Sequence, residues 1–232
     1  MPQVLLQWND LMGKINTMEN IVVVGAGGFG REVKMLIDQI NEESPKFNFI
    51  GFYDDSVQKG TKIAGFSVLG TIEELNIVKE STAVCIAIGA PKIKKEIVSK
   101  LTNPKLTFPN LIHPSVIMGI PLKTLGKGII ICAGSIITVD IVIGDFVTLN
   151  LGITVGHDTT IGDYCAFMPQ ANIAGEVVLG EAVYGGMGVG IINQVTVGDN
   201  VTLGAGSVLV KNIPSNCLAV GVPAKVIKQY EE

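Results

Sequence analysis

A period of six residues dominates the second half of the chain. Every sixth residue from Leu125 to Leu209 is aliphatic or aromatic except Gly185, which makes fourteen of fifteen positions. The residue four places further on is small or β-branched throughout, from Ile129 to Ser207. A helix repeats about every 3.6 residues and is weakened by glycine, whereas short strands joined by tight turns accept both features. The period therefore predicts a β-helix of hexapeptide repeats.

Three hexads form one triangular coil, so residues 125–214 predict five coils. Successive coils are expected at the usual strand spacing of about 4.8 Å. A β-sandwich with regular turns is the alternative, but its strands recur roughly every 8 to 12 residues. The shorter period favours the β-helix.

Residues 20–100 follow a different pattern, in which strands alternate with helices. A β-branched run, a cluster of glycines and a segment with apolar residues at helical spacing follow one another. The expected elements are strands at 21–24, 49–53 and 83–88 and helices at 31–40 and 91–101. This order predicts a small α/β domain with a parallel sheet.

Composition excludes several classes of protein. The chain has 232 residues, a mean hydropathy of +0.46, and 21 acidic against 17 basic side chains, which predicts a folded protein without a nucleic-acid surface. Polar residues and glycines interrupt every apolar run, so neither a membrane span nor a secretion signal is expected. The four cysteines lie far apart without a CxxC pair, which favours free thiols over a disulfide framework or a metal site. We therefore expect a cytoplasmic protein without a metal.

Two glycine-containing motifs and the hexads resemble one protein family. The motifs are GAGGFGRE at 25–32 and GVPAKVI at 221–227. Together with the hexads they resemble the bacterial hexapeptide-repeat sugar acetyltransferases, which include sialic acid O-acetyltransferases and N-acetyltransferases of nucleotide-linked 4-amino-sugars. The resemblance covers about residues 18–228. It implies a left-handed β-helix, acetyl-CoA as donor, and a homotrimer with active sites between subunits.

The resemblance also divides the chain. It implies a Rossmann-like domain that binds a sugar nucleotide at 18–102 and a left-handed β-helix acetyltransferase domain at 115–232. The linker is placed at 103–114 because this segment contains three prolines and no clear period. Residues 1–17 precede the matching part and are interpreted as an N-terminal extension.

The chain has two histidines, and imidazole is the side chain best suited to accept a proton near neutral pH. His157 follows the inward position Val155 by two residues and is expected to point outward, whereas His113 falls in the linker, where a structural role is expected. A solvated surface histidine is the alternative for His157. The resemblance implies that His157 is the catalytic base and that Asp158 orients its ring. An unpaired surface carboxylate is the alternative for Asp158.

Further site residues come from the same resemblance. Asn150 matches an asparagine that holds the acceptor, or else forms a turn. Gly175 follows His157 by one coil, so the two are expected to stack, and its N–H could meet a developing oxyanion, unless it is a simple turn glycine. Acetyl-CoA is implied along this edge, with Gly204 and Ala205 further along the groove.

The glycine loop is the candidate acceptor site. Gly25, Gly27, Gly28 and Gly30 lie between a strand and a helix, where free N–H groups can receive a pyrophosphate. Asp54 and Asp55 end the next strand, where carboxylates can bind a ribose or a base. The resemblance assigns both groups to the nucleotide of a sugar nucleotide; plain surface turn residues are the alternative for the aspartates.

One departure from the family concerns substrate recognition. Many relatives carry a second histidine nine residues after the first, but this chain has Ala166 there. Recognition of the acceptor or donor is therefore expected to differ.

These features predict an acetyl-CoA-dependent N-acetyltransferase of a nucleotide-linked 4-amino-4,6-dideoxy sugar, acting by direct transfer in surface glycan or glycoprotein sugar biosynthesis. O-acetylation of sialic acid or another sugar is the first alternative. A non-catalytic sugar-nucleotide sensor and an NAD-linked oxidoreductase are the others.

Overall fold

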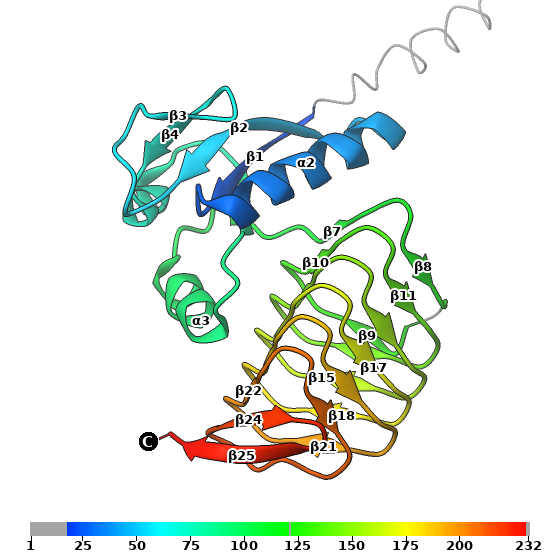
Figure 1. Ribbon diagram of the computed structural model, residues 1–232. Helices are drawn as coiled ribbons and strands as arrows, with labels where there is room; N and C mark the ends of the chain where they lie inside the picture. Colours follow the sequence, from blue (N-terminus) through cyan, green and yellow to red (C-terminus); the bar gives the residue numbers. More distant parts are fainter. Residues whose placement is uncertain (1–17, 121, 231–232) are drawn as a thin grey trace, which may run out of the picture.

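The chain forms an α/β domain and a β-solenoid that lie end to end. The computed structural model describes residues 18–120 and 122–230, so the expected extension at 1–17 lies outside the described residues. The α/β domain lies over the first coils of the solenoid, and a C-terminal hairpin closes the opposite end (Figure 1). Within the described residues, no helix is long and apolar enough to cross a membrane.

The α/β domain is built on a six-stranded sheet of order β3-β4-β2-β1-β5-β6. All neighbouring strands are parallel except β3 and β4. The strands are β1 (Glu19–Val24), β2 (Phe47–Tyr53), β3 (Lys62–Ile63), β4 (Phe66–Gly70), β5 (Thr82–Ile86) and β6 (Leu106–Thr107). The helices are α2 (Gly28–Glu43), the 3-10 helix η1 (Ile72–Ile77) and α3 (Pro91–Lys100).

Both faces of this sheet are covered, which explains the uninterrupted apolar run in β1. Ile21 and Val23 pack with α2, whereas Val22 and Val24 pack on the opposite face with η1 and α3. The expected strands and helices are present with shifted ends. Short elements without a clear period, namely β3, β4, β6 and η1, were not expected.

The solenoid consists of three parallel sheets that the chain visits in turn. The first sheet contains β7 (Leu111–Ile112), β10 (Ile130–Ile131), β13 (Thr148–Leu149), β16 (Ala166–Phe167), β19 (Tyr184–Gly185), β22 (Thr202–Leu203), β24 (Cys217–Gly221) and the antiparallel β25 (Ala224–Gln229). The second contains β8 (Ile117–Met118), β11 (Ile136–Ile137), β14 (Thr154–Val155), β17 (Asn172–Ile173), β20 (Gly190–Ile191) and β23 (Val208–Leu209). The third contains β9 (Thr124–Leu125), β12 (Val142–Ile143), β15 (Thr160–Ile161), β18 (Val178–Leu179) and β21 (Thr196–Val197).

The hexads fill the inside of the solenoid. Their apolar and small positions are buried from Ile129 onward, whereas Leu125 is partly exposed. Gly185 interrupts the apolar series because the ring of Phe167, one coil earlier, occupies the space of its missing side chain. The fold class is therefore as predicted, a Rossmann-like domain followed by a left-handed β-helix.

The solenoid begins earlier than the hexads indicate. Its second sheet has six strands, so the prediction of five coils from residue 125 is one coil short. Strand β10 pairs with β7, and the expected linker at 103–114 contains both β6 of the α/β sheet and β7 of the solenoid. One extra residue between β8 and β9 breaks the strict period in this first coil.

A buried lysine joins the two domains. Lys94 of α3 is 1% exposed and donates hydrogen bonds of 2.8 Å to the carbonyl of Phe146 and the hydroxyl of Thr148 in the solenoid. Burial lowers the pKa of Lys94 to about 7 because the charged form loses its hydration. The α/β domain is therefore held against the solenoid by polar as well as apolar contacts.

Candidate active site

Two edges of the solenoid carry the candidate residues. The histidine edge comprises the turns that lead from the second sheet to the third, and it contains His157 and Gly175. The asparagine edge comprises the turns that lead from the first sheet to the second, and it contains Asn150. Because each coil is a triangle, the two edges lie at different corners.

His157 stands outward on the histidine edge and is paired with Asp158. Its side chain is 58% exposed, and its Nδ1 lies 3.0 Å from Oδ2 of Asp158. Asp158 adopts a φ of 57°, a left-handed conformation at the turn. Hydrogen bonds from Lys123 and then from His157 lower the pKa of Asp158, so the carboxylate is ionised and accepts a hydrogen bond from Nδ1–H of His157. The other ring nitrogen, Nε2, is left to face a substrate.

Gly175 lies directly under the ring of His157. A methyl group added at Gly175 would approach Nε2 of His157 to 2.7 Å, so only glycine leaves the ring in its present place. Among the described residues, none accepts a hydrogen bond from the N–H of Gly175. The turn therefore combines an imidazole nitrogen with a free backbone donor, which is the pair that acyl transfer requires.

The structure separates the other predicted residues from His157. Asn150 is 5% exposed, and its Oδ1 accepts a hydrogen bond of 2.7 Å from the N–H of Leu151, as a turn-forming asparagine would. Gly204 and Ala205 follow β22 and lie on the asparagine edge, three coils after Asn150. The expectation that Gly204 and Ala205 continue the edge of His157 and Gly175 is therefore wrong within one chain. The sequence spacing predicts this separation, because residues share an edge only when they are separated by whole coils of 18 residues.

The glycine loop lies between β1 and α2 as predicted from its motif. A side chain at Gly30 would overlap the carbonyl oxygen of Gly25, and Gly25 has a φ of 100°. Gly27 and Gly28 face open space at the start of α2, and no side chain caps that helix. Gly25 and Gly30 thus shape the turn, while the N–H groups at Gly27 and Gly28 remain available for an anion.

Asp54 and Asp55 lie at the same end of the sheet. Asp54 accepts hydrogen bonds from the N–H of Ala26 at 2.8 Å and from Ser56, so it braces the glycine loop. Burial opposes ionisation of Asp54, but these hydrogen bonds outweigh it and lower the pKa. Asp55 accepts the N–H of Ile72 at the start of η1. Both carboxylates therefore have structural partners in addition to any ligand.

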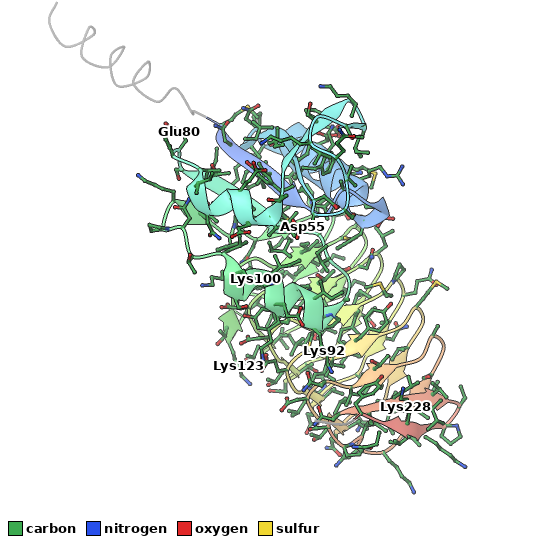
Figure 2. The ribbon with its side chains drawn as sticks, turned by 90° about the vertical axis from the view of Figure 1, so that its left-hand side faces the viewer. Asp55, Glu80, Lys92, Lys100, Lys123 and Lys228 are labelled. Carbon is green, nitrogen blue, oxygen red and sulfur yellow. The ribbon has the colours of Figure 1, made fainter. Side chains whose placement is uncertain are left out.

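The sequence did not reveal a pocket between the domains. It has a volume of about 650 Å³, the size of a small-molecule site. It extends from Gly89, after β5, along the outer face of the first sheet. Its walls include Met168, Tyr184, Thr202 and Tyr230. Lys92 on α3 and Lys228 on the C-terminal hairpin both flank the ring of Tyr230. Figure 2 shows where these two lysines lie.

The remaining candidates have structural roles. Cys165 is buried, and burial raises the pKa of its thiol to about 12, so it is not a thiolate at neutral pH. His113 accepts a hydrogen bond from the N–H of Ser115. Ala166, at the position of the second family histidine, is fully buried on the first sheet. In the part of the chain that the structure describes, no cluster of His, Cys, Asp or Glu is arranged to hold a metal ion.

The fold and the histidine turn together define an acyltransferase of the β-helix class. Residues 20–101 match the family model described as the PglD N-terminal domain. The GDP-perosamine N-acetyltransferase of Escherichia coli O157:H7 is 30% identical over 200 residues, which cover 86% of this chain and 81% of that protein. The chain therefore belongs to the hexapeptide-repeat sugar acetyltransferases.

Two solved structures share the whole arrangement. PerB from Caulobacter crescentus, solved in complex with CoA and GDP-perosamine, has a TM-score of 0.79 at 29% identity, with 91% of this chain and 99% of that chain covered. The acetyltransferase domain of PglB from Neisseria gonorrhoeae FA1090, in complex with acetyl coenzyme A, has a TM-score of 0.80 at 30% identity, with 90% and 100% covered. Both match the α/β domain and the solenoid together.

Proposed function

We propose that this protein transfers the acetyl group of acetyl-CoA to the amine of a nucleotide-linked 4-amino-4,6-dideoxy sugar. Its relatives include GDP-perosamine N-acetyltransferases, and PerB was solved with CoA and GDP-perosamine. The observation that carries the proposal is the turn in which His157 pairs with Asp158 and lies over Gly175. The division into a sugar-nucleotide domain at 18–102 and an acetyltransferase domain at 115–232 is part of the same proposal.

His157 acts as the general base. Asp158 holds the proton on Nδ1, so the lone pair of Nε2 accepts a proton from the acceptor amine as its nitrogen attacks the thioester carbon. The ionised Asp158 stabilises the imidazolium that results. The imidazolium then returns the proton to the departing sulfur of CoA, which balances the transfer of one acetyl group for one proton.

Gly175 serves the donor side of the reaction. Acetyl-CoA, when bound, supplies the thioester carbonyl whose oxygen gains negative charge during attack. The N–H of Gly175 is the donor for that charge, and the missing side chain lets the thioester lie against the ring of His157. Cys165 is excluded as an acyl carrier by its burial, which favours direct transfer.

The α/β domain is the place for the nucleotide. In its sheet the order reverses between β1 and β5, and ligands of such sheets bind at the carboxyl ends of the strands at this switch point. Gly25 and the residues after β5 adjoin there, since a side chain at Gly25 would meet Ala87 and Ile88. A pyrophosphate at Gly27 and Gly28 would direct the sugar toward the pocket that begins at Gly89.

A homotrimer accounts for the separation of the two edges. The outer face of the second sheet and the edges that flank it expose apolar side chains. These are Ile117, Ile120, Ile136, Val139, Leu151, Met187 and Ile192. If this face turns toward a threefold axis, the asparagine edge of one subunit meets the histidine edge of the next. Asn150, Gly204 and Ala205 would then lie opposite His157 and Gly175 of a neighbour.

Thiol release from acetyl-CoA tests the proposal. The acceptors are UDP-, dTDP- and GDP-linked 4-amino-4,6-dideoxysugars, free sialic acid and CMP-sialic acid, with His157→Ala as the comparison. Turnover of one amino-sugar by the wild type, lost in the variant, is expected. Turnover only with a sialic acid would instead establish O-acetylation. Silence with every acceptor would contradict acetyl transfer and favour a non-catalytic sugar-nucleotide sensor. Tight NAD binding without acetyl-CoA binding would favour an NAD-linked oxidoreductase.

The predicted cytoplasmic location and the role in glycan biosynthesis belong to the proposal as well.

A further inference from the structure

A series of close approaches joins the glycine loop to the asparagine edge. A side chain at Gly25 would meet the carbonyl oxygen of Ala87 at 2.9 Å, so the loop lies against the segment that follows β5. Two residues later, a methyl group added at Gly89 would lie 3.9 Å from Cε of Met168. Met168 is the position one coil after Asn150, because β13 ends before Asn150 and pairs with β16, which ends before Met168. A sugar that extends from the glycine loop to the asparagine edge therefore passes Met168.

Met168 lies at the apolar end of the pocket between the domains. Its half-buried side chain faces Gly89, and the residues that follow Gly89 along the pocket wall are Ala90 and Pro91. Methionine is apolar and flexible, so its side chain adapts to the surface of an apolar ligand group. This end of the pocket thus offers a ligand apolar contact.

The polar side chains of the pocket lie further from the glycine loop. They belong to Lys92, Tyr184, Asn200, Thr202 and Tyr230. Tyr184 and Thr202 lie one and two coils beyond Met168 on the first sheet. The ammonium of Lys92 lies 5.4 Å from the centre of the Tyr230 ring, which follows the C-terminal hairpin. The pocket is therefore apolar where a sugar would enter it and polar toward the end of the solenoid.

The chemistry of the sugar decides which of its atoms meets this apolar end. In a pyranose the nucleotide is attached at C1, while C6 is carried by C5, the neighbour of C4. When the 4-amine lies at the asparagine edge, C6 therefore lies beside it. A methyl group at C6 gains from apolar contact, whereas a hydroxyl group would give up its hydrogen bonds to water without a polar side chain beside it.

We propose that Met168 is a specificity-determining residue that selects acceptors without a hydroxyl group at C6. Its side chain contacts the C6 methyl group and excludes water from it. The inference rests on the proposed binding of the nucleotide at the glycine loop and of the sugar at Asn150. An apolar wall rejects an added hydroxyl group only moderately, so the expected preference for the 6-deoxy sugar is about 10- to 100-fold.

Unreactive nucleotide sugars test this preference without turnover. GDP-linked 6-deoxy-D-mannose and GDP-linked D-mannose differ only at C6, and 6-deoxy-D-glucose and D-glucose form the same pair on UDP and on dTDP. Isothermal titration of the full chain gives the Kd of each compound. In the pair whose nucleotide the protein binds, the 6-deoxy sugar should bind about 10- to 100-fold more tightly. Equal affinities within every pair would overturn the inference, and no binding of any pair would overturn the proposed nucleotide site with it.

Three variants assign the preference to Met168. Met168→Gln places an amide of similar length where it can pair with a 6-hydroxyl group, so the preference should fall to about threefold or less. Met168→Leu keeps the wall apolar and should retain the preference. Met35→Gln is the matched control, because Met35 is a partly exposed methionine on α2 that does not line this pocket. An unchanged preference in Met168→Gln would overturn the inference.

Thiol release from acetyl-CoA separates this inference from the proposed function. The acceptors are 4-amino-4-deoxy sugars on the preferred nucleotide, with and without the 6-hydroxyl group. Equal kcat/KM for the two would overturn the role of Met168 and leave acetyl transfer established. A preference in binding that Met168→Gln abolishes, in a protein that releases no thiol with either acceptor, would support the role of Met168 and contradict the proposed function.

Discussion

The α/β domain and the solenoid reach their structures by opposite means. In the α/β domain individual glycines have individual roles, since Gly30 allows α2 to approach Gly25 and Gly27 is the N-cap of that helix. In the solenoid a six-residue repeat places the strands from β9 to β23, and the outward side chains are free to vary. Functional residues therefore lie at the outward positions of the turns. His157 projects from one turn, and Gly175, which has no side chain, lies beneath its ring in the next coil. The repeat supplies the geometry, and its variable positions supply the chemistry.

The largest effect is expected at the exposed turn of the solenoid. His157→Ala removes the base, so kcat should fall about 100- to 10,000-fold, while thermal stability and acceptor binding stay near wild type because the ring is exposed. Steady-state kinetics and isothermal titration of the acceptor measure both. His113→Ala is the matched control and should retain kcat. Equal losses in both variants would contradict the role of His157 as the base.

Gly175 tests whether the neighbouring coil takes part in chemistry. In Gly175→Ala the new methyl group displaces the ring of His157, so kcat should fall roughly 10- to 100-fold. Gly190→Ala is the control, because its methyl group would meet Val208 only at 3.8 Å. Thermal unfolding of both variants should resemble that of the wild type. A fully active Gly175→Ala enzyme would show that this glycine is only a turn residue.

Substitutions in the α/β domain should change acceptor binding rather than kcat. Gly30→Ala forces its methyl group into the backbone of Gly25, which should cost about 1 to 3 kcal/mol of stability and raise the KM for the acceptor roughly tenfold. Gly28→Ala, whose methyl group meets open space, should keep the free energy of unfolding. Denaturant unfolding and acceptor titrations give the two numbers. An unchanged acceptor KM in Gly30→Ala, with the KM for acetyl-CoA raised instead, would reverse the roles of the domains.

Lys94 tests the contact between the two regions. Burial lowers its pKa to about 7 in the folded protein, whereas the unfolded chain keeps a value near 10.5. Above pH 7 the unfolded state binds more protons, so stability should rise with pH. The gain is on the order of 1 to 2 kcal/mol between pH 7 and pH 8.5. Buried thiols such as Cys165 act in the opposite direction only from about pH 9, because burial raises their pKa.

Chemical denaturation at the two pH values measures this gain. Lys94→Met preserves the length of the side chain and should abolish the rise, although it lowers stability at both pH values by leaving the carbonyl of Phe146 without a partner. A rise of equal size in Lys94→Met would assign the effect to other groups.

Sequence reasoning succeeded where one residue position repeats and failed where the repeat is broken. The hexads predicted the inner faces from Ile129 onward, and the 18-residue spacing predicted that His157 would stack on Gly175. The extra residue between β8 and β9 hid the first coil, and with it the approach of Lys123 to Asp158. No spacing rule connects those two residues, since a long side chain spans the intervening coil.

The two edges show a different limit. Asn150 and His157 are close in sequence but lie at different corners of a coil. Their positions within the hexads predict this separation, whereas the family resemblance alone suggested a single site. The pocket along Tyr184 requires α3 to lie beside the first sheet, and no local pattern predicts how two domains pack. Contacts between domains and between subunits depend on residues far apart in sequence or on different chains, so local sequence patterns do not predict them.

Mixed trimers test the central claim, that the asparagine edge of one subunit completes the histidine edge of the next. Asn150→Ala and His157→Ala subunits, each expected to be inactive alone, are produced together with different affinity tags and purified on both. In every mixed trimer one interface in three should pair an intact Asn150 with an intact His157, which restores about a third of wild-type turnover. Mixed trimers as inactive as the two parents would contradict a site shared between subunits.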